Sequence, residues 1–282
     1  MKNQTQESRT KNQVLRKCLF SLGAWFLILG SLSAHSAERI VSLNACTDEL
    51  LLQLAHPDQI AGVTHFQHSP ISEKKLMEYP QIARIPGDVE KILALHPSLV
   101  LAGIFSNALL LEQLRKAGIP VTLIKTPANW EELIQAGKEV ARTAAPSGSL
   151  GRLEKNIAEI KKLGASSKWQ GKTAVFWSAA GHVSGRGTFE DTILKTLGLQ
   201  NIIEFKGYGF LSLEKLIQLK PDVVVVTQRK KRKDSWSHDM LFHPALQTAL
   251  PNLEYIEIPE TAASCASIYS AESLMQVLQD AA

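Results

Sequence analysis

One phrase occurs twice in this chain, and it constrains the fold more than any other feature of the sequence. Residues 88–103 read DVEKILALHPSLVLAG, and residues 212–227 read SLEKLIQLKPDVVVVT. In each copy a Glu-Lys pair opens an amphipathic run, a proline interrupts it, and a block of aliphatic residues follows. Proline ends helices, and short aliphatic blocks bounded by turn signals are typical of buried strands. Each copy therefore predicts a helix followed by a buried strand.

Helix-like and strand-like segments alternate along the whole chain, with one copy of the phrase in each half. Such alternation predicts an α/β fold with mostly parallel sheets. The length of 282 residues exceeds the usual size of one domain and suits two domains of about 100–150 residues. We expect two Rossmann-like lobes, whose strands are RIVSLN, IAGVT, SLVLAG and PVTLIKT in the first half and TAVFWSA, DVVVVT and EYIEIP in the second.

A long helical pattern separates the two halves. Apolar residues recur there at helical spacing, at Leu150, Leu153, Ile157, Ile160 and Leu163. Gly164 provides a stop signal. We expect a single long bridging helix between the lobes. The predicted organisation is a first lobe at residues 38–146, the bridging helix at 147–168 and a second lobe at 169–282.

The segment before the first lobe has the pattern of a secretory signal peptide. A basic leader precedes the apolar run CLFSLGAWFLILGSL, and the small residues SAHSA follow it. Ala34 and Ser36 suit the small-residue positions of a cleavage site, so cleavage is expected near Ala37 and the mature protein in the periplasm. The apolar run is also close to the length that spans a bilayer, and an uncleaved anchor is the alternative.

Two cysteines, Cys46 and Cys265, follow this leader. Cys46 comes after the first expected strand of the first lobe, and Cys265 lies in the last strand-to-helix loop of the second. An oxidising compartment favours pairing them, which requires Cα atoms within about 7 Å. The sequence leaves three roles open: a disulfide between the lobes, unpaired structural thiols, or contact with a ligand.

Candidate ligand contacts follow the expected strands. In open α/β sheets a ligand binds beyond the carboxyl ends of the strands, and two lobes would place such loops on opposite walls of one cleft. The candidates are Phe66, Phe105, His182, Tyr208, Arg229 and Cys265. The three aromatic residues among them suit a wall against a flat or bulky ligand.

Two further patterns bear on the ligand. Arg229 opens the run RKKRK, which would attract an anionic ligand if it lies at the cleft or would otherwise be a solvated loop. Imidazoles that could ligate a metal occur at His65, His68 and His182, but no two of them have the spacing of a metal site. We therefore predict no metal site.

Catalytic motifs are missing from the sequence. It contains no G-x-S-x-G, H-E-x-x-H or P-loop pattern. The run GRGTFE begins like a dinucleotide-binding loop at Gly185, but Glu190 stands where that loop has its last glycine. The net charge of +4 is too small to indicate a nucleic-acid partner. We expect a monomeric binding protein that is not an enzyme and carries no cofactor.

Taken together, the motifs resemble the solute-binding proteins of ABC importers for cobalamin, iron-siderophores and haem, which have two lobes joined by one long helix. The resemblance runs from about Arg39 to the C-terminus. It is carried by the order and spacing of RIVSLNACTDELLLQL, IAGVT, DVEKILALHPSLVLAG, GRGTFEDTILKTLGLQNI and LEKLIQLKPDVVVVT.

The resemblance implies a receptor that captures a metal chelate, either cobalamin or a ferric siderophore, in an inter-lobe cleft and delivers it to a membrane permease and its ATPase. A haem receptor of the same type and a ligand-sensing module not coupled to transport are the alternatives. Tyr208 stands where cobalamin-binding relatives carry a ligand-contacting Trp, and TAASCASIYS lacks the acid and arginine expected near that site. The resemblance therefore implies a class of ligand and does not identify the chelate.

The resemblance also implies a role for the acid at the head of each copy of the phrase. In the cobalamin-binding member, one acidic residue at this position in each lobe pairs with arginines of the permease, and Glu90 and Glu214 match those positions. Two exposed carboxylates on rigid lobes would suit the planar fork of guanidinium groups. The other interpretation is that both are ordinary first-turn acids, which the helix dipole favours.

Overall fold

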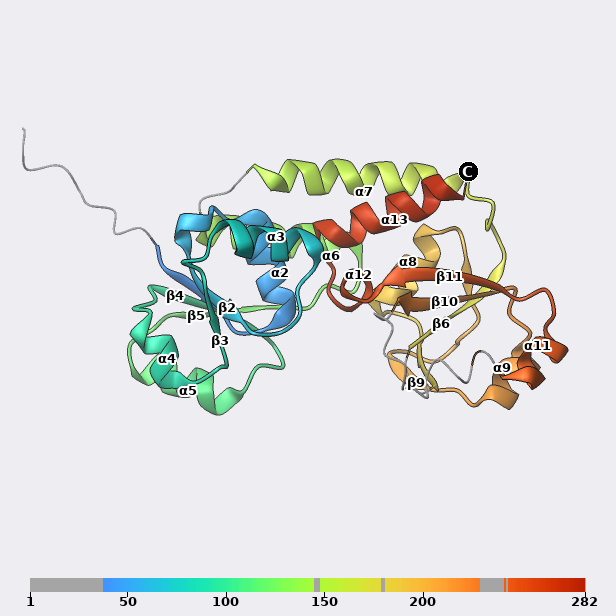
Figure 1. Ribbon diagram of the computed structural model, residues 1–282, viewed down its shortest axis with the longest axis horizontal. Helices are drawn as coiled ribbons and strands as arrows, with labels where there is room; N and C mark the ends of the chain where they lie inside the picture. Colours follow the sequence, from blue (N-terminus) through green and yellow to red (C-terminus); the bar gives the residue numbers. More distant parts are fainter. Residues whose placement is uncertain (1–37, 145–147, 179–180, 229–240, 242, 282) are drawn as a thin grey trace, which may run out of the picture. The chain divides into compact units, whose positions relative to one another are not determined.

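The computed structural model describes residues 38–144, 148–178, 181–228, 241 and 243–281 (Figure 1). The predicted signal peptide at residues 1–37 lies outside these ranges, as does the run RKKRK. No helix within the described ranges is long and apolar enough to cross a membrane. The described chain folds as two α/β lobes, each built on its own sheet.

The sheet of the first lobe has five strands in the order β3-β2-β1-β4-β5. All of its pairings are parallel, so the carboxyl ends of the strands lie along one edge. The strands are β1 (Ile40–Ser42), β2 (Ile60–Thr64), β3 (Ala83–Ile85), β4 (Leu99–Gly103) and β5 (Val121–Ile124). The helices of this lobe are α2 (Ala45–Leu54), η1 (Pro57–Gln59), α3 (Pro70–Glu78), α4 (Val89–Ala94), α5 (Ala108–Lys116) and α6 (Trp130–Thr143).

The sheet of the second lobe is mixed. Its strands follow the order β11-β10-β6-β7-β9, and β8 also pairs with β6. The pairings of β6 with β10 and β8 and of β10 with β11 are parallel, whereas β7 runs antiparallel to both of its neighbours. The strands are β6 (Thr173–Trp177), β7 (His182–Ser184), β8 (Gln200–Asn201), β9 (Tyr208–Phe210), β10 (Val223–Gln228) and β11 (Glu254–Pro259). The helices are α8 (Phe189–Thr196), α9 (Leu213–Leu219), α11 (Pro244–Ala249), α12 (Glu260–Ser264) and α13 (Ile268–Asp280).

The repeated phrase forms the same unit in each lobe. The first copy is α4 followed by β4, and the second is α9 followed by β10. Both strands lie inside their sheets, since β4 pairs with β1 and β5 and β10 pairs with β6 and β11. This position explains the aliphatic blocks, because a strand covered on both faces needs apolar residues throughout.

The bridging helix is α7 (Ser149–Ala165), but it does not connect the lobes unaided. The C-terminal helix α13 lies along it, and α6 and α2 of the first lobe and α8 of the second also pack against it (Figure 1). Gly164 at the end of α7 permits the approach to α8, because a Cβ there would lie 1.9 Å from the carbonyl oxygen of Thr196.

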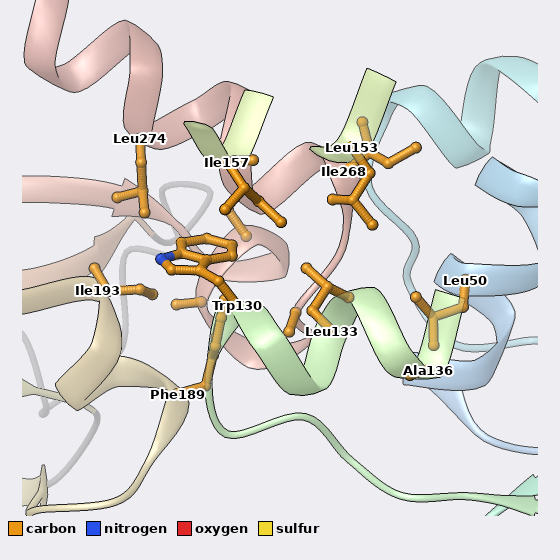
Figure 2. Packing of buried hydrophobic residues seen from close by; sticks show 14 of the residues in the cluster. Leu50, Trp130, Leu133, Ala136, Leu153, Ile157, Phe189, Ile193, Ile268 and Leu274 are labelled. Atoms are coloured by element: carbon orange, nitrogen blue, oxygen red, sulfur yellow. The ribbon is translucent and has the colours of Figure 1, made fainter. Parts of the chain in front are cut away.

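One hydrophobic core runs through this junction. Figure 2 shows Leu153 and Ile157 of α7 pointing into a cluster that contains Leu50 from the first lobe and Ile193 from the second. Trp130, the first residue of α6, packs edge-on against Phe189 of α8 and donates a hydrogen bond of 2.8 Å to the Thr196 hydroxyl. Separating the lobes would expose these apolar side chains to water, which is unfavourable, so the lobes are joined by a shared core as well as by a helix.

Candidate ligand-binding site

A disulfide joins the carboxyl ends of the two sheets. Cys46 lies in the first turn of α2, shortly after β1, and Cys265 directly follows α12, the short helix that comes after β11. The two sulfur atoms are 2.05 Å apart and the Cα atoms 4.9 Å apart. The sequence left three roles open for these cysteines, and in the structure they form the disulfide between the lobes. Cys265 is consequently not a free thiol beside a ligand.

Apolar side chains are exposed at the carboxyl edge of the first sheet. Phe66 follows β2 and is 53% exposed, while Ile104 and Phe105 follow β4 and are 50% and 84% exposed. Since β2 and β4 both pair in parallel with β1, these loops share the edge that carries Cys46. His65 stacks on Phe66 with ring centroids 5.0 Å apart. Phe66 and Phe105, both predicted ligand contacts, are therefore exposed rings at this edge.

The second sheet presents a similar group at its own carboxyl edge. Strand β7 begins at His182, near the carboxyl end of β6, because Val183 pairs with Trp177, the last residue of β6. His182 pairs with Phe210 of β9, and their ring centroids are 3.9 Å apart. Tyr208 and Phe210 are 68% and 71% exposed. They lie on one face of β9 because side chains two residues apart on a strand point the same way.

Tyr208 is tied to an acid of the neighbouring helix. Its hydroxyl donates to Oε2 of Glu190, in the first turn of α8, at 3.1 Å. Burial raises the pKa of Glu190 above its ordinary value. Desolvation also raises the pKa of Tyr208, and the charge of Glu190 raises it further. Tyr208 thus remains a protonated phenol that presents its ring to solvent.

The predicted histidines have different surroundings. His65 and His182 are exposed, whereas His68 is buried and its Nε2 lies 3.1 Å from Oδ2 of Asp48. Within the described ranges, no group of three or more His, Cys, Asp or Glu side chains is arranged to hold a metal ion.

Sequence reasoning missed several residues at these edges. Phe210 was not among the candidates, although the alternation Tyr-Gly-Phe is a short strand signal. Ile104 was not named beside Phe105, and Glu190 was considered a departure from a dinucleotide-binding loop, not a site residue. Arg229 lies outside the described residues, so its predicted contact stays a prediction.

A shallow hollow lies elsewhere, beside the edge strand β5. It is lined by Leu123, Ile124, Lys125, Glu132, Gln135, Ala136 and Glu139. An ion pair of 3.0 Å between Lys125 and Glu132 belongs to its wall. None of the predicted ligand contacts lines this hollow.

The two acids of the repeated phrase occupy equivalent positions. Glu90 and Glu214 are exposed in the first turns of α4 and α9. No ion pair found among the described residues includes either of them. A hydrogen bond from Ser212 lowers the pKa of Glu214, as does the backbone at the helix start. The carboxylate of Glu214 is therefore ionised at neutral pH.

Comparison with known proteins agrees with this architecture. The family model described as periplasmic binding protein matches residues 40–262. An uncharacterized ABC transporter substrate-binding lipoprotein, YvrC of Bacillus subtilis, is 25% identical over 217 residues, which cover 71% of this chain and 68% of that protein. A vitamin B12-binding protein of Yersinia pseudotuberculosis is 25% identical over 214 residues, 73% of this chain and 75% of its own.

A solved structure shares the fold. The periplasmic heme-binding protein HutB of Vibrio cholerae superposes with a TM-score of 0.71 at 23% identity, covering 86% of this chain and 98% of that one. At 23% identity this similarity shows that the two proteins share a fold.

Proposed function

Because the chain belongs to the periplasmic binding protein family, we propose that it is the exported receptor of an ABC importer and captures a metal chelate, cobalamin or a ferric siderophore. The observation that carries the choice of ligand is the set of exposed rings at the carboxyl edges of both sheets, Phe66, Phe105, Tyr208 and Phe210. Exposed apolar groups of this kind commonly mark binding sites.

The ligand is proposed to sit between the two carboxyl edges. The Cys46–Cys265 bond brings these edges together at one point, so a ligand held by one set of rings would be near the other. Corrin rings and the apolar arms of siderophores offer flat or bulky surfaces that aromatic side chains can cover. Membership of a binding-protein family supports capture and delivery and gives no support to a catalytic role.

Tyr208 contributes a ring and a hydrogen-bonding hydroxyl in this proposal. A phenolate that ligates iron would need a lowered pKa, and the pKa of Tyr208 is raised. Haem is the second candidate ligand because His182 offers an exposed imidazole at the same edge, and imidazole is a common haem ligand. A haem-binding protein with this fold supports keeping that alternative.

Delivery is proposed to use Glu90 and Glu214. Both carboxylates are exposed, lie on equivalent helices and are free of ion pairs among the described residues, so they are available to guanidinium groups of a permease. The permease and its ATPase are the partners that this function requires.

A fluorescence titration tests the ligand. Purified mature protein is titrated with cyanocobalamin, haemin, a ferric hydroxamate and a ferric catecholate, and tryptophan emission is followed. Trp177 ends β6 at the proposed site, so one of these chelates is expected to quench emission saturably. The absence of a saturable response to all four would overturn the proposal.

A pair of variants locates the site. Tyr208→Ala with Phe210→Ala is expected to weaken binding of the quenching chelate by about tenfold or more, since each lost aromatic contact is worth about 1 kcal/mol. Met77→Ala is the control, because Met77 is equally exposed at 74% but lies near the end of α3, away from the carboxyl edge. Equal affinities for both variants would place the ligand elsewhere.

A further inference from the structure

A buried cluster of charged side chains lies beneath the loop that presents Phe66. We propose that His68, paired with Asp48 and Glu73, is a positioning residue that holds the β2–α3 loop, residues 65–69, in its ligand-facing form, so that ligand affinity depends on the protonation of His68. This inference deepens the proposed function and, in its ligand-binding part, rests on it.

Both nitrogens of the His68 ring face carboxylates. The side chain is fully buried, its Nε2 lies 3.1 Å from Oδ2 of Asp48, and its Nδ1 lies 3.5 Å from Oε1 of Glu73. Nδ1 makes no hydrogen bond at that distance, so its contact with Glu73 is one of charge. A neutral imidazole would direct a lone pair at one of the two carboxylates, whereas an imidazolium carries a positive charge and an N–H on each side. The geometry therefore suits the charged form of His68.

Asp48 holds both ends of the exposed part of the loop. Its Oδ2 accepts from the backbone N–H of Thr64, the last residue of β2, at 3.1 Å and also contacts the His68 ring. Between these two residues lie His65, Phe66 and Gln67, all three exposed. The Phe66 ring thus projects from a short span whose two ends share one buried carboxylate.

The neighbouring acid of α2 holds the residue that follows. Glu49 accepts from the backbone N–H of Ser69 at 2.7 Å and from its hydroxyl at 2.6 Å. Ser69 is the N-cap of α3, so the loop is tied to α2 at its end as well. Consecutive acids of one helix therefore bind the base of the loop at Thr64, His68 and Ser69.

The charges around His68 come from each element packed against it. Asp48 and Glu49 belong to α2, Glu73 belongs to α3, and Arg84 of β3 pairs with Glu73. Arg84 lowers the pKa of Glu73 and keeps that group ionised, although desolvation acts in the opposite direction. From the surface inward the charges therefore alternate. Arg84 is positive and Glu73 negative, and protonated His68 is positive beside negative Asp48.

The balance around His68 favours its protonation. Burial by itself lowers the pKa of His68, but the hydrogen bond and charge of Asp48, with the charges of Glu49 and Glu73, raise it above 6.5 overall. A group whose pKa is raised in the folded state stabilises that state fully at a pH below its unperturbed pKa. This stabilisation is lost as the pH rises through the raised pKa. The loop is therefore expected to loosen as the pH rises above about 6.5.

Loosening follows from the loss of one ring proton. Deprotonation leaves a single N–H on the His68 ring, so buried Asp48 loses its cationic partner while Glu73 keeps Arg84. A buried charge without a partner is strongly unfavourable, and movement of the loop that admits water would relieve it. Phe66 would then lose its fixed position at the edge of the sheet.

The test compares the wild type with His68→Gln over a range of pH. The first readout is hydrogen exchange of the amides of residues 65–69 in the ligand-free protein, expressed as protection factors corrected for the intrinsic rate. The second is the affinity for the chelate that quenches fluorescence. In the wild type, protection and affinity are expected to fall together by about tenfold as the pH rises through the His68 transition, because the buried charged hydrogen bond to Asp48 is weakened.

His68→Gln is expected to give low protection and weak binding that no longer change over this range. His56→Gln is the matched control, because His56 is an exposed histidine whose partner Asp58 is also exposed, and it should keep the wild-type profile. Glu73→Gln is a second test variant if His68→Gln does not fold. Because it removes a negative charge beside His68, it should move the pH at which His68 deprotonates to a lower value.

Two results would overturn the inference. One is a protection profile of the loop that is the same in His68→Gln, or in Glu73→Gln, as in the wild type. The other is a wild-type profile without a transition above pH 6.5. If no chelate binds at all, the proposed function fails while the exchange data on the ligand-free protein still decide whether His68 holds the loop.

Discussion

The two copies of the repeated phrase behave alike as scaffold and differ where they meet the proposed site. Ile92 in the first copy and Leu216 in the second are fully buried at 0% exposure. His96 and Lys220, which precede the prolines, have φ angles of 47° and 49° and are the only described residues other than glycine with positive φ. The phrase therefore encodes the same helix, the same left-handed stop and the same buried strand twice.

The copies diverge at the end of their strands. The first ends in Gly103 and the second has Thr227 at that position. A Cβ at Gly103 would lie 2.9 Å from the side chain of Asn44, the N-cap of α2, the helix that carries Cys46 and Asp48. The repeat therefore provides the same helix and strand in both lobes, while single residues at the carboxyl edge differ between the lobes.

The largest expected effect concerns the acids that the two copies share. Glu90→Arg together with Glu214→Arg is expected to abolish uptake of the bound chelate in cells, because both contacts with permease guanidinium groups become repulsive. Each single variant should retain part of the uptake. Chelate affinity in vitro should stay at the wild-type value.

A double reversal at Glu78 and Glu154, exposed acids of α3 and α7, is the control and should leave uptake intact. Normal uptake by the Glu90/Glu214 double variant would show that these acids are ordinary helix-start residues.

The next prediction tests whether the two copies contribute equally to the free energy of unfolding. Ile92→Ala and Leu216→Ala should each lower the free energy of unfolding by about 2–5 kcal/mol, because each leaves a cavity in a packed cluster. Urea denaturation followed by circular dichroism measures both. Gln218→Ala, on the exposed side of α9, should change the value by less than about 0.5 kcal/mol. Very unequal losses would argue against equivalent packing.

A smaller effect is expected where the copies differ. Gly103→Thr, which makes the first copy match the second, should destabilise the protein by about 1–3 kcal/mol because the added Cβ crowds Asn44. The same urea titration measures this loss. An unchanged free energy of unfolding would mean that Asn44 moves aside without cost, and the divergence of the copies would need another reason.

The smallest expected change in stability concerns His96 and Lys220, the two residues with positive φ before the prolines. His96→Gly and Lys220→Gly should each raise the free energy of unfolding by about 0.5–1 kcal/mol, since glycine adopts positive φ without the steric cost that other residues incur but loses more chain entropy. Lys91→Gly in the interior of α4 is the control and should lower the value by about 1 kcal/mol. A loss at His96 or Lys220 would show that their side chains make contacts that outweigh the strain.

The parts of the fold that could be predicted are those with long periodic patterns. The bridging helix, expected within residues 147–168, is Ser149–Ala165 in the structure and differs by only a few residues at its ends. The strands β3, β7, β8 and β9 were missed because each has two or three residues, too few for an alternation to stand out. Helix α3 was missed although Ser69 and Pro70 form a typical start signal.

The site was less predictable. That the loops after β2 and β4 share one edge could be predicted because parallel strands place their carboxyl ends together, and this rule needs only the order of elements. The pairing of Asp48 with His68 was not predicted, since an acid at a helix start is explained locally by capping and its partner lies in a separate loop. Burial of that kind depends on how α2 packs against the sheet.

The two lobes, their shared helix–strand unit and the helix between them could be predicted from local patterns, because periodicity, helix stops and turn residues act over a few neighbouring positions. The folded chain was needed to show that Cys46 bonds to Cys265, that Phe210 contacts His182, and that Asp48 binds both ends of the Phe66 loop. Each of these contacts joins segments separated along the chain, and their distances depend on the register and packing of the sheets.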